Sequence, residues 1–427
     1  MPDRPGLPSR RLALVLTGLA TLAIAAITLT PIPGAEEQAA GTPLDCIICG
    51  SAGAVDVLYN LLLFLPLGFG LRWLGVSPGR VVLVSFLATL SIEAAQLSLV
   101  AGRDASLSDL LTNTAGGGLG ALLWEALPVL VRPAGRSSRL LVFLAALLPA
   151  GTLSGAAWLL GPAPPATLWF GQWAPDIGMY EHYEGRVLSA TLQGRPMPPR
   201  ALRDLNTAID WRDQPLEVSA TFTKAGPEAG IAPIVSVFDR SHTKVLFLGQ
   251  ESATRLRFEA RVRAENFRFR PLALAFDGAL DAPAADTLTA SARFDGRSVR
   301  LAVRHGEDTR TREVALSPAL GWALVAPLGG TVDRDARLFS AVWLALLWIP
   351  LGYYLARSRA GSSAGWVLVP AGAAALVTAL VTVLAGFPFN HWSELAAAGG
   401  GAAAGSALAG VIRRREQSRK HERPTRR

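Results

Sequence analysis

The amino-acid sequence predicts an α-helical polytopic membrane bundle of about eight spans with one inserted all-β domain. Half of the residues are hydrophobic (50%) and only 17% are charged, whereas soluble domains carry about a quarter charged residues. Apolar stretches of about 20 residues, the length that crosses a bilayer, recur on both sides of residues 164–335. Within 164–335 charges return and apolar residues alternate with polar ones, which indicates strands.

The N-terminal membrane region, residues 1–161, contains five expected spans. Basic residues precede the first span and no clear small-residue cleavage site follows it, so we expect an uncleaved helix rather than a signal peptide. Three more spans are expected in the C-terminal region, 337–412, ahead of a basic tail at 413–427. The expected spans are about 12–30, 54–74, 80–100, 107–131, 139–161, 337–356, 364–386 and 393–412.

The net charge of +8 lies mostly in short loops and tails beside the spans. This pattern is typical of the positive-inside rule and argues against a nucleic-acid partner. With a cytoplasmic N-terminus, the loops 72–80, 132–139 and 356–361 and the C-terminal tail all become cytoplasmic, and all are basic. We therefore expect a multi-pass protein of the bacterial cytoplasmic (inner) membrane, with both termini inside and the β domain extracytoplasmic.

Most polar side chains of the expected membrane spans lie in or near residues 91–120. Asn60, Glu93 and Asn113 lie about 8–10 Å from the outer ends of their expected helices, at 1.5 Å per residue. A shared depth favours a single site in the outer half of the membrane. Interhelical hydrogen bonding for stability alone stays open as the alternative. The predicted membrane polar cluster comprises Asp56, Asn60, Glu93, Gln96, Arg103, Asp109 and Asn113.

Glu93 is the residue of this cluster that most needs a partner, because a carboxyl group within an apolar span must be either paired or protonated. Arg103, in the hinge between two expected spans, is the candidate partner. Histidine is absent from the cluster, and the sequence around it offers no group of metal ligands. We therefore assign no catalytic residue and no metal site.

These motifs resemble the VanZ-like family of bacterial membrane proteins over roughly residues 10–131. The resemblance rests on Asp56-x-x-x-Asn60 followed by Leu-Phe-Leu-Pro-Leu-Gly, on Ser91-Ile-Glu93-x-x-Gln96, and on Asn113-Thr114-x-Gly116. It implies a membrane bundle and a link to glycopeptide antibiotic resistance, with which founding members are associated. The chain departs from the family in lacking a His-x-x-x-Tyr-like pattern near its first span.

An internal parallel repeat relates the two membrane regions. LLFLPLGFGLRW at 62–73 resembles LLWIPLGYYLAR at 346–357, and SDLLTNTAGGGLG at 108–120 resembles SELAAAGGGAAAG at 393–405. The second copy lacks equivalents of Glu93, Gln96 and Asn113, so we expect it to support packing. Four repeated glycines are expected to allow close helix contact: Gly116, Gly120, Gly401 and Gly405.

The two cysteines of the chain, Cys46 and Cys49, form a Cys-x-x-Cys in the first extracytoplasmic loop. Disulfides persist on that side of the membrane. A Cys-x-x-Cys outside a βαβ context is not a redox motif in itself. We therefore expect a local structural disulfide, with a redox pair as the alternative.

The inserted domain, 164–335, is expected to be an antiparallel sandwich of short strands. Phe-Leu-Gly-Gln at 247–250 followed by the strand Leu-Arg-Phe-Glu-Ala-Arg resembles a concanavalin A-like lectin or LamG domain, a jelly-roll fold. The resemblance implies glycan binding, or less often glycan hydrolysis, without locating a site. The expected strands are 216–224, 231–239, 244–250, 255–263, 286–294 and 298–306.

Trp169, Trp173 and Trp211 are the glycan-stacking candidates of this domain, although aromatic residues more often fill a core. Calcium is the one cofactor considered, because it takes oxygen ligands and three aspartates of this domain could supply them. The same aspartates are also typical turn residues, which is the alternative interpretation. Those aspartates are Asp281, Asp286 and Asp295.

Three functions remain open. The preferred one is a non-enzymatic envelope protein that lies in the lipid bilayer and binds an extracytoplasmic glycan or a lipid-linked envelope precursor. The second is a membrane enzyme acting on a lipid-linked substrate, with Glu93 and Asp109 as acid and base. The third is a transporter of an amphiphilic or anionic small molecule, which the parallel repeat would suit.

Overall fold

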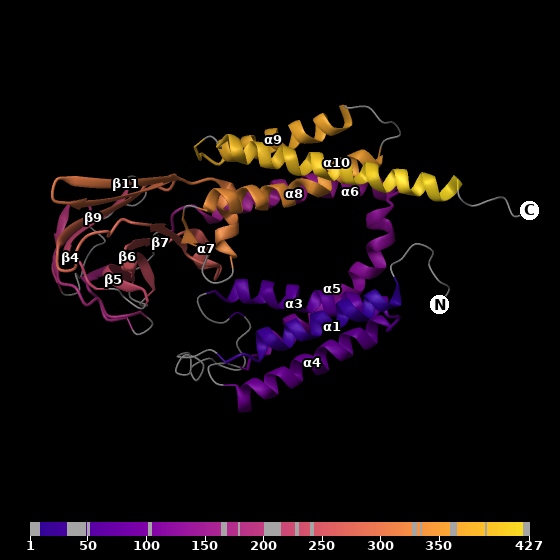
Figure 1. Ribbon diagram of the computed structural model, residues 1–427, viewed down its shortest axis with the longest axis horizontal. Coiled ribbons are helices and arrows are strands. Elements are labelled where there is room, and N and C mark those ends of the chain that lie inside the picture. Colours follow the sequence, from indigo (N-terminus) through magenta and orange to yellow (C-terminus); the bar gives the residue numbers. More distant parts are fainter. Residues whose placement is uncertain are drawn as a thin grey trace, which may run out of the picture. The chain divides into compact units, whose positions relative to one another are not determined.

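The computed structural model shows a helical membrane protein with an inserted β domain (Figure 1). The chain forms two compact units, one of residues 1–137 with 267–269 and one of 138–266 with 270–427. The structure describes residues 9–31, 48, 52–100, 105–163, 169–177, 180–199, 215–226, 230–239, 243–326, 331–333, 335–358, 365–388 and 391–421.

The first unit consists of helices α1 (Arg10–Thr28), α3 (Gly53–Trp73), α4 (Pro78–Leu99) and α5 (Leu107–Val131). Their ends follow from local sequence. Pro78 begins α4, where its fixed φ suits the first turn. Ser106 caps α5 by accepting a hydrogen bond from the backbone N–H of Asp109 at 3.0 Å.

The second unit contributes α6 (Gly135–Leu159), α8 (Ala336–Ser358), α9 (Gly365–Leu384) and α10 (Trp392–His421), with α6 starting in the first unit. Among the described residues, eight helices are long and apolar enough to cross a membrane. The predicted helical membrane bundle of about eight spans is therefore confirmed. The bilayer is its environment.

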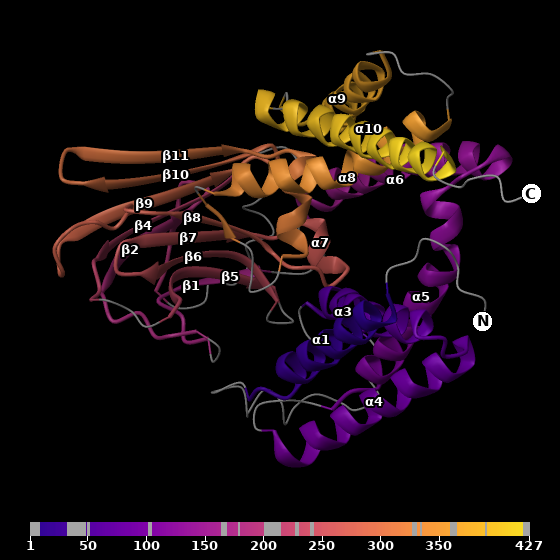
Figure 2. The same ribbon diagram turned by 45° about the vertical axis from the view of Figure 1, so that its right-hand side comes forward.

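Two six-stranded sheets make up the β domain and lie face to face (Figure 2). The first, called sheet 1, has the order β1-β5-β6-β7-β8-β12, and sheet 2 has the order β11-β10-β9-β4-β2-β3. All pairings are antiparallel except that of β12 with β8. The strands are β1 (Trp169–Trp173), β2 (Val187–Leu192), β3 (Arg195–Met197), β4 (Leu216–Thr223), β5 (Ala232–Asp239), β6 (Lys244–Ser252), β7 (Arg255–Ala260), β8 (Leu272–Phe276), β9 (Thr287–Phe294), β10 (Ser298–His305), β11 (Asp308–Ala315) and β12 (Thr331–Val332).

This β-sandwich confirms the predicted fold class, and all six predicted strands are present as β4, β5, β6, β7, β9 and β10. Sheet 2 alternates buried and exposed positions along β4, as expected of a sheet with one solvated face. Sheet 1 differs, because β5 is buried at every position. Both faces of sheet 1 are therefore covered, and a short helix, α7 (Arg263–Asn266), follows β7.

A short 3-10 helix, η2 (Pro318–Leu324), lies between β11 and β12 and packs against α8. Its Trp322 donates an indole hydrogen bond to the Ser340 hydroxyl of α8 at 3.0 Å. Just before it, the Ser317 hydroxyl donates to the Glu394 carboxylate of α10 at 2.9 Å. These contacts fix the base of the β-sandwich on the N-terminal ends of α8 and α10.

Candidate functional site

Four hydrogen bonds link the polar residues of the first unit across its helices. The Asn60 amide donates to the Asp109 carboxylate at 2.7 Å, which ties α3 to α5. Glu93 on α4 accepts a hydrogen bond from the backbone N–H of Ser106 at 2.7 Å. Two further bonds run from Gln96 Nε2 to the Thr28 carbonyl oxygen at 2.9 Å and from Asn113 Nδ2 to Thr89 Oγ1 at 3.0 Å.

Ser106 is the point at which the two carboxylates of this cluster meet. Its N–H donates to Glu93, and its hydroxyl accepts from the N–H of Asp109. The Glu93 side chain is buried, with an exposed fraction of 8%. Glu93 therefore binds the N-terminal end of α5, where a helix presents N–H groups that lack partners within it. Asp56 lies in the first turn of α3, four residues before Asn60.

Glycine residues bring α3 and α5 into backbone contact. A Cβ atom at Gly116 would clash with the Leu61 carbonyl oxygen, and one at Gly120 would clash with that of Leu65. Such close approach is what small residues provide at helix interfaces in membranes.

The same contact recurs between α8 and α10 in the second unit. A Cβ atom at Gly401 would clash with the Ala345 carbonyl oxygen, and one at Gly405 with that of Ile349. Each contact of the first pair thus has a counterpart at the matching position of the internal repeat. The polar residues do not recur, because Leu344 stands where Asn60 would.

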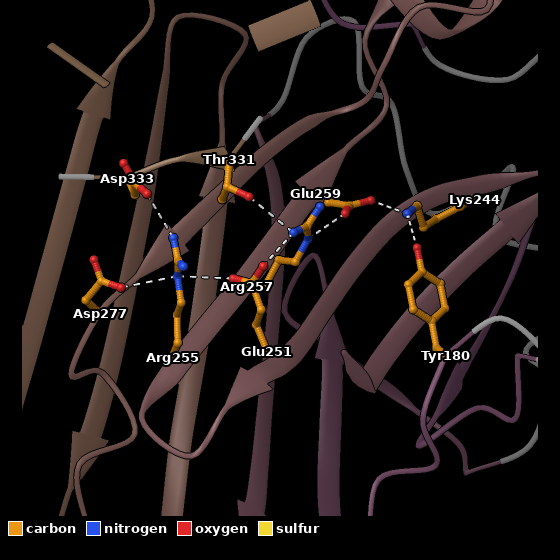
Figure 3. Close-up of polar contacts among 9 residues, drawn as sticks. All are labelled: Tyr180, Lys244, Glu251, Arg255, Arg257, Glu259, Asp277, Thr331 and Asp333. Atoms are coloured by element: carbon orange, nitrogen blue, oxygen red, sulfur yellow. Dashed lines mark hydrogen bonds and ion pairs between the residues drawn. The ribbon is translucent and has the colours of Figure 1, made fainter. Parts of the chain in front are cut away.

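A line of charged side chains crosses one face of sheet 1 (Figure 3). Arg255, Arg257 and Glu259 alternate along β7, so they share a face. Arg257 Nε lies 2.7 Å from Glu259 Oε1, and its Nη1 lies 2.8 Å from Glu251 Oε1. Arg255 binds Glu251 at 3.1 Å. We call this set the polar ladder: Tyr180, Lys244, Glu251, Arg255, Arg257, Glu259, Asp277, Thr331 and Asp333.

Glu259 is the most buried member of the polar ladder, with an exposed fraction of 2%. Burial alone would raise its pKa, but Lys244 and Arg257 hold the pKa of this carboxyl below its usual value. Burial alone would lower the pKa of the Lys244 ammonium, and the Glu259 carboxylate and the Tyr180 hydroxyl raise it instead. The Tyr180 hydroxyl accepts from Lys244 Nζ at 2.8 Å. All three charges therefore persist inside the domain.

The polar ladder ends at a cavity of about 590 Å³ at the base of the β-sandwich. Asp277 and Asp333 bind Arg255 at 3.2 and 3.1 Å. Both residues belong to the polar ladder and also line the cavity. Helices α8 and α10 close its other side. Its polar lining is mixed in charge and rich in hydroxyl groups: Asp277, Thr311, Arg312, Glu313, Ser317, Asp333, Arg337, Ser340, His391 and Glu394.

Comparison with protein families identifies the first unit. Residues 15–130 match the family model described as VanZ/LLP1. The chain is a multi-pass membrane protein whose residues 15–130 are similar to the VanZ/LLP1 family. The match ends with α5, and it covers about a quarter of the chain. Neither the curated proteins nor the solved structures gave a match.

Several predicted site residues lie outside the described residues: Arg103, Cys46, Cys49 and Trp211. Trp169 begins β1. The Trp173 indole donates to the Met197 carbonyl oxygen at 2.9 Å and so connects β1 of sheet 1 to β3 of sheet 2. This bond gives Trp173 a structural role at the edge of the β-sandwich.

The three aspartates considered for calcium make separate contacts in the structure. Asp286 lies 2.9 Å from His305 Nε2, and Asp295 accepts two backbone N–H bonds at 2.8 and 2.6 Å within its own turn. Asp281 lies 3.9 Å from Arg310. Within the described residues, no group of three or more His, Cys, Asp or Glu side chains has a metal-binding arrangement.

The polar ladder and the cavity are features of the second unit that the sequence did not predict. The sequence carried one signal for them, the alternating charges of Arg-Leu-Arg-Phe-Glu at 255–259. Charges at every second position of a strand normally mark a solvated face. Their partners come from β6, β8 and the segment at 331–333, so the pairing required the fold.

Proposed function

We propose that this VanZ-like protein is a non-enzymatic cell-envelope protein whose β-sandwich binds a saccharide on the extracytoplasmic side of the membrane. The observation that carries the proposal is the cavity at the base of the β-sandwich. Carboxylates, guanidinium groups and hydroxyls line it together, and these are the groups that hydrogen-bond sugar hydroxyls. A cavity of this volume suits a ligand of a few sugar rings.

The polar ladder supports the same proposal. Asp277 and Asp333 are held by Arg255, which is itself bound to Glu251. Groups that are fixed by neighbours before a ligand arrives lose less entropy on binding. A contribution to glycopeptide resistance belongs to this proposal, with a peptidoglycan precursor or an envelope polysaccharide as the glycan.

The binding test uses the full chain in lipid nanodiscs on an array of glycans and muropeptides, with and without calcium. Glu313 and Arg337 line the cavity with exposed side chains, so Glu313→Gln combined with Arg337→Gln should leave the fold intact. We expect the double variant to bind the recognised glycan about tenfold more weakly.

The matched control is Glu307→Gln with Arg304→Gln, a second exposed acid and base of the same domain that do not line the cavity. It should bind as the wild type does. A folded wild type that binds no glycan on the array would contradict the proposal, as would equal loss in both double variants.

The second candidate function is a membrane enzyme with Glu93 and Asp109 as acid and base. The meeting of both carboxylates at Ser106 favours it. Turnover of a lipid-linked envelope substrate that Glu93→Gln abolishes, with expression and thermal stability unchanged, would support this candidate over the binding protein. Equal turnover in the variant would count against it.

A further inference from the structure

An apolar groove of about 650 Å³ runs between α6 and α8 in the second unit. Both helices are candidate membrane spans, so hydrocarbon is the solvent around the groove. Its lining is almost entirely apolar, with the Thr152 hydroxyl and Tyr354 as the exceptions: Leu141, Leu144, Ala145, Leu147, Leu148, Gly151, Thr152, Pro350 and Tyr354.

The groove and the cavity lie along the same side of α8. Ala336 and Ser340 line the cavity, and Pro350 and Tyr354 line the groove. At 3.6 residues per turn, these four positions fall within about 80° of one another around the helix and extend over about 27 Å of its length, and Arg337, which also lines the cavity, widens the arc to about 140°. A single elongated molecule could therefore contact both sites.

Trp343 lies on this side of α8 between the two sites. It packs against the cluster that contains Leu153 of α6 and Ala319 of η2. Its indole N–H is buried and has no hydrogen-bond partner among the residues that the structure describes. A buried donor without a partner costs free energy, and Trp343 is not among the residues that line the cavity or the groove.

We propose that the saccharide ligand is anchored to a lipid, with its sugar in the cavity and its hydrocarbon chain in the α6–α8 groove. This inference rests on the proposed function and adds the chemical class of the ligand, an amphiphilic glycolipid. The charged cavity accepts only the polar part, and the apolar groove only the chain.

The test uses a disaccharide joined through pyrophosphate to a polyprenyl chain that carries a benzophenone. The full chain is placed in vesicles of phosphatidylethanolamine and phosphatidylglycerol and irradiated, and labelled peptides are mapped by mass spectrometry. We expect labelling at 141–152 and 350–354. An excess of the unlabelled lipid-linked disaccharide should compete, and the polyprenol alone should compete much less.

Gly151 offers a way to fill the groove. It lines the groove, and a Cβ atom there would meet nothing within 4 Å, so Gly151→Leu should fold normally. Its side chain would displace about two methylenes of the ligand chain, which corresponds to about a tenfold loss of labelling. The matched control is Gly372→Leu on α9, which also has open space around it and lies outside the groove. It should label as the wild type does.

The cavity variant Glu313→Gln with Arg337→Gln separates this inference from the proposed function. Loss of labelling in both this variant and Gly151→Leu supports a ligand that occupies both sites. Free-glycan binding at the cavity together with groove labelling that Gly151→Leu leaves unchanged would overturn the inference and keep the proposed function. Uniform labelling of all lipid-facing helices, or equal competition by polyprenol, would also overturn it, because the groove would then hold bilayer hydrocarbon only.

Discussion

At the scale of single residues, Glu259 has the largest expected effect on stability. Its carboxylate binds both Lys244 and Arg257, so Glu259→Gln leaves Lys244 without its carboxylate partner and Arg257 with Glu251 alone. Removing one partner of a buried pair costs about 3–5 kcal/mol. We expect the variant to unfold its β-sandwich at a clearly lower temperature, measured by intrinsic fluorescence of the purified full chain.

The control for this prediction is Asp286→Asn, which breaks the ion pair with His305. That pair lies on the surface, with side chains 39% and 43% exposed, and should contribute less than about 1 kcal/mol. Equal destabilisation by the two variants would show that Glu259 has no special role.

Glu265 makes the folding stability of the β-sandwich depend on pH. Burial raises the pKa of this carboxyl from 4.5 to about 7, against the opposing effects of the Val262 N–H, Lys244 and Arg261, while Glu259 adds to the increase. A raised pKa means that the folded state binds the proton more tightly than the unfolded state. Its contribution to stability is therefore full below pH 4.5 and is lost as the pH rises to about 7.

We expect Glu265→Gln to remove this dependence, because its amide stays neutral and can still accept the N–H of Val262. Urea unfolding of the wild type and the variant between pH 4.5 and 8 measures it. The variant should gain stability relative to the wild type as the pH rises. A constant difference across this range would contradict the pKa assignment of Glu265.

At the scale of helices and strands, the glycine contacts set how closely α3 and α5 approach. Gly120→Ala places a Cβ atom against the Leu65 carbonyl oxygen, so the two helices must separate. Overpacking of this kind costs about 1–3 kcal/mol. We expect a lower midpoint in thermal unfolding of the detergent-solubilised protein.

Gly118→Ala provides the comparison on the same helix. Its Cβ atom would lie 3.5 Å from Val82 Cγ2, an ordinary van der Waals contact. This variant should be as stable as the wild type or slightly more stable, because alanine favours helix over glycine. A destabilised Gly118→Ala with a normal Gly120→Ala would mean that the glycine contacts do not govern this interface.

The elements that the sequence could predict are those whose pattern follows directly from burial. Continuous apolar runs predicted the membrane helices, and alternation predicted strands such as β4 and β10. It could not predict β11, Asp-Thr-Arg-Thr-Arg-Glu-Val-Ala, because an edge strand that is exposed along most of its length carries no apolar period. The three-residue β3 and the two-residue β12 are too short for a pattern.

The contacts of the candidate site residues also differ in how far the sequence could predict them. The sequence placed Asn60, Glu93 and Asn113 at a similar depth, and in the structure Asn60 binds Asp109 while Glu93 accepts from the Ser106 N–H. The partner of Asn113 is Thr89, a residue that composition does not distinguish from other hydroxyls in spans. The cavity was beyond prediction, because its lining comes from several separate segments of the chain, at 276–277, 311–320 and 332–333, and from α8 and the start of α10.

At the scale of the whole molecule, the arrangement of basic loops predicts on which side of the membrane each part lies. Thr309→Cys lies on exposed strand β11, and Ala134→Cys lies in the exposed turn between α5 and α6. Each is introduced into a chain whose two native cysteines are replaced by serine. We expect a membrane-impermeant maleimide to label Thr309→Cys in intact cells and Ala134→Cys only after permeabilisation. The reverse pattern would place the β-sandwich in the cytoplasm.

The repeated glycine contacts have a consequence for the number of spans between the two copies. The pair α3–α5 and the pair α8–α10 pack through matching positions, and the parallel repeat predicts that both copies cross the bilayer in the same direction. Only an odd number of crossings between α3 and α8 allows this, and the crossings are α4, α5 and α6. Helix α6 is thus the return crossing that restores the direction of the chain after the first copy. Deleting it alone should invert everything that follows, and only a change that removes or adds spans in pairs preserves the architecture.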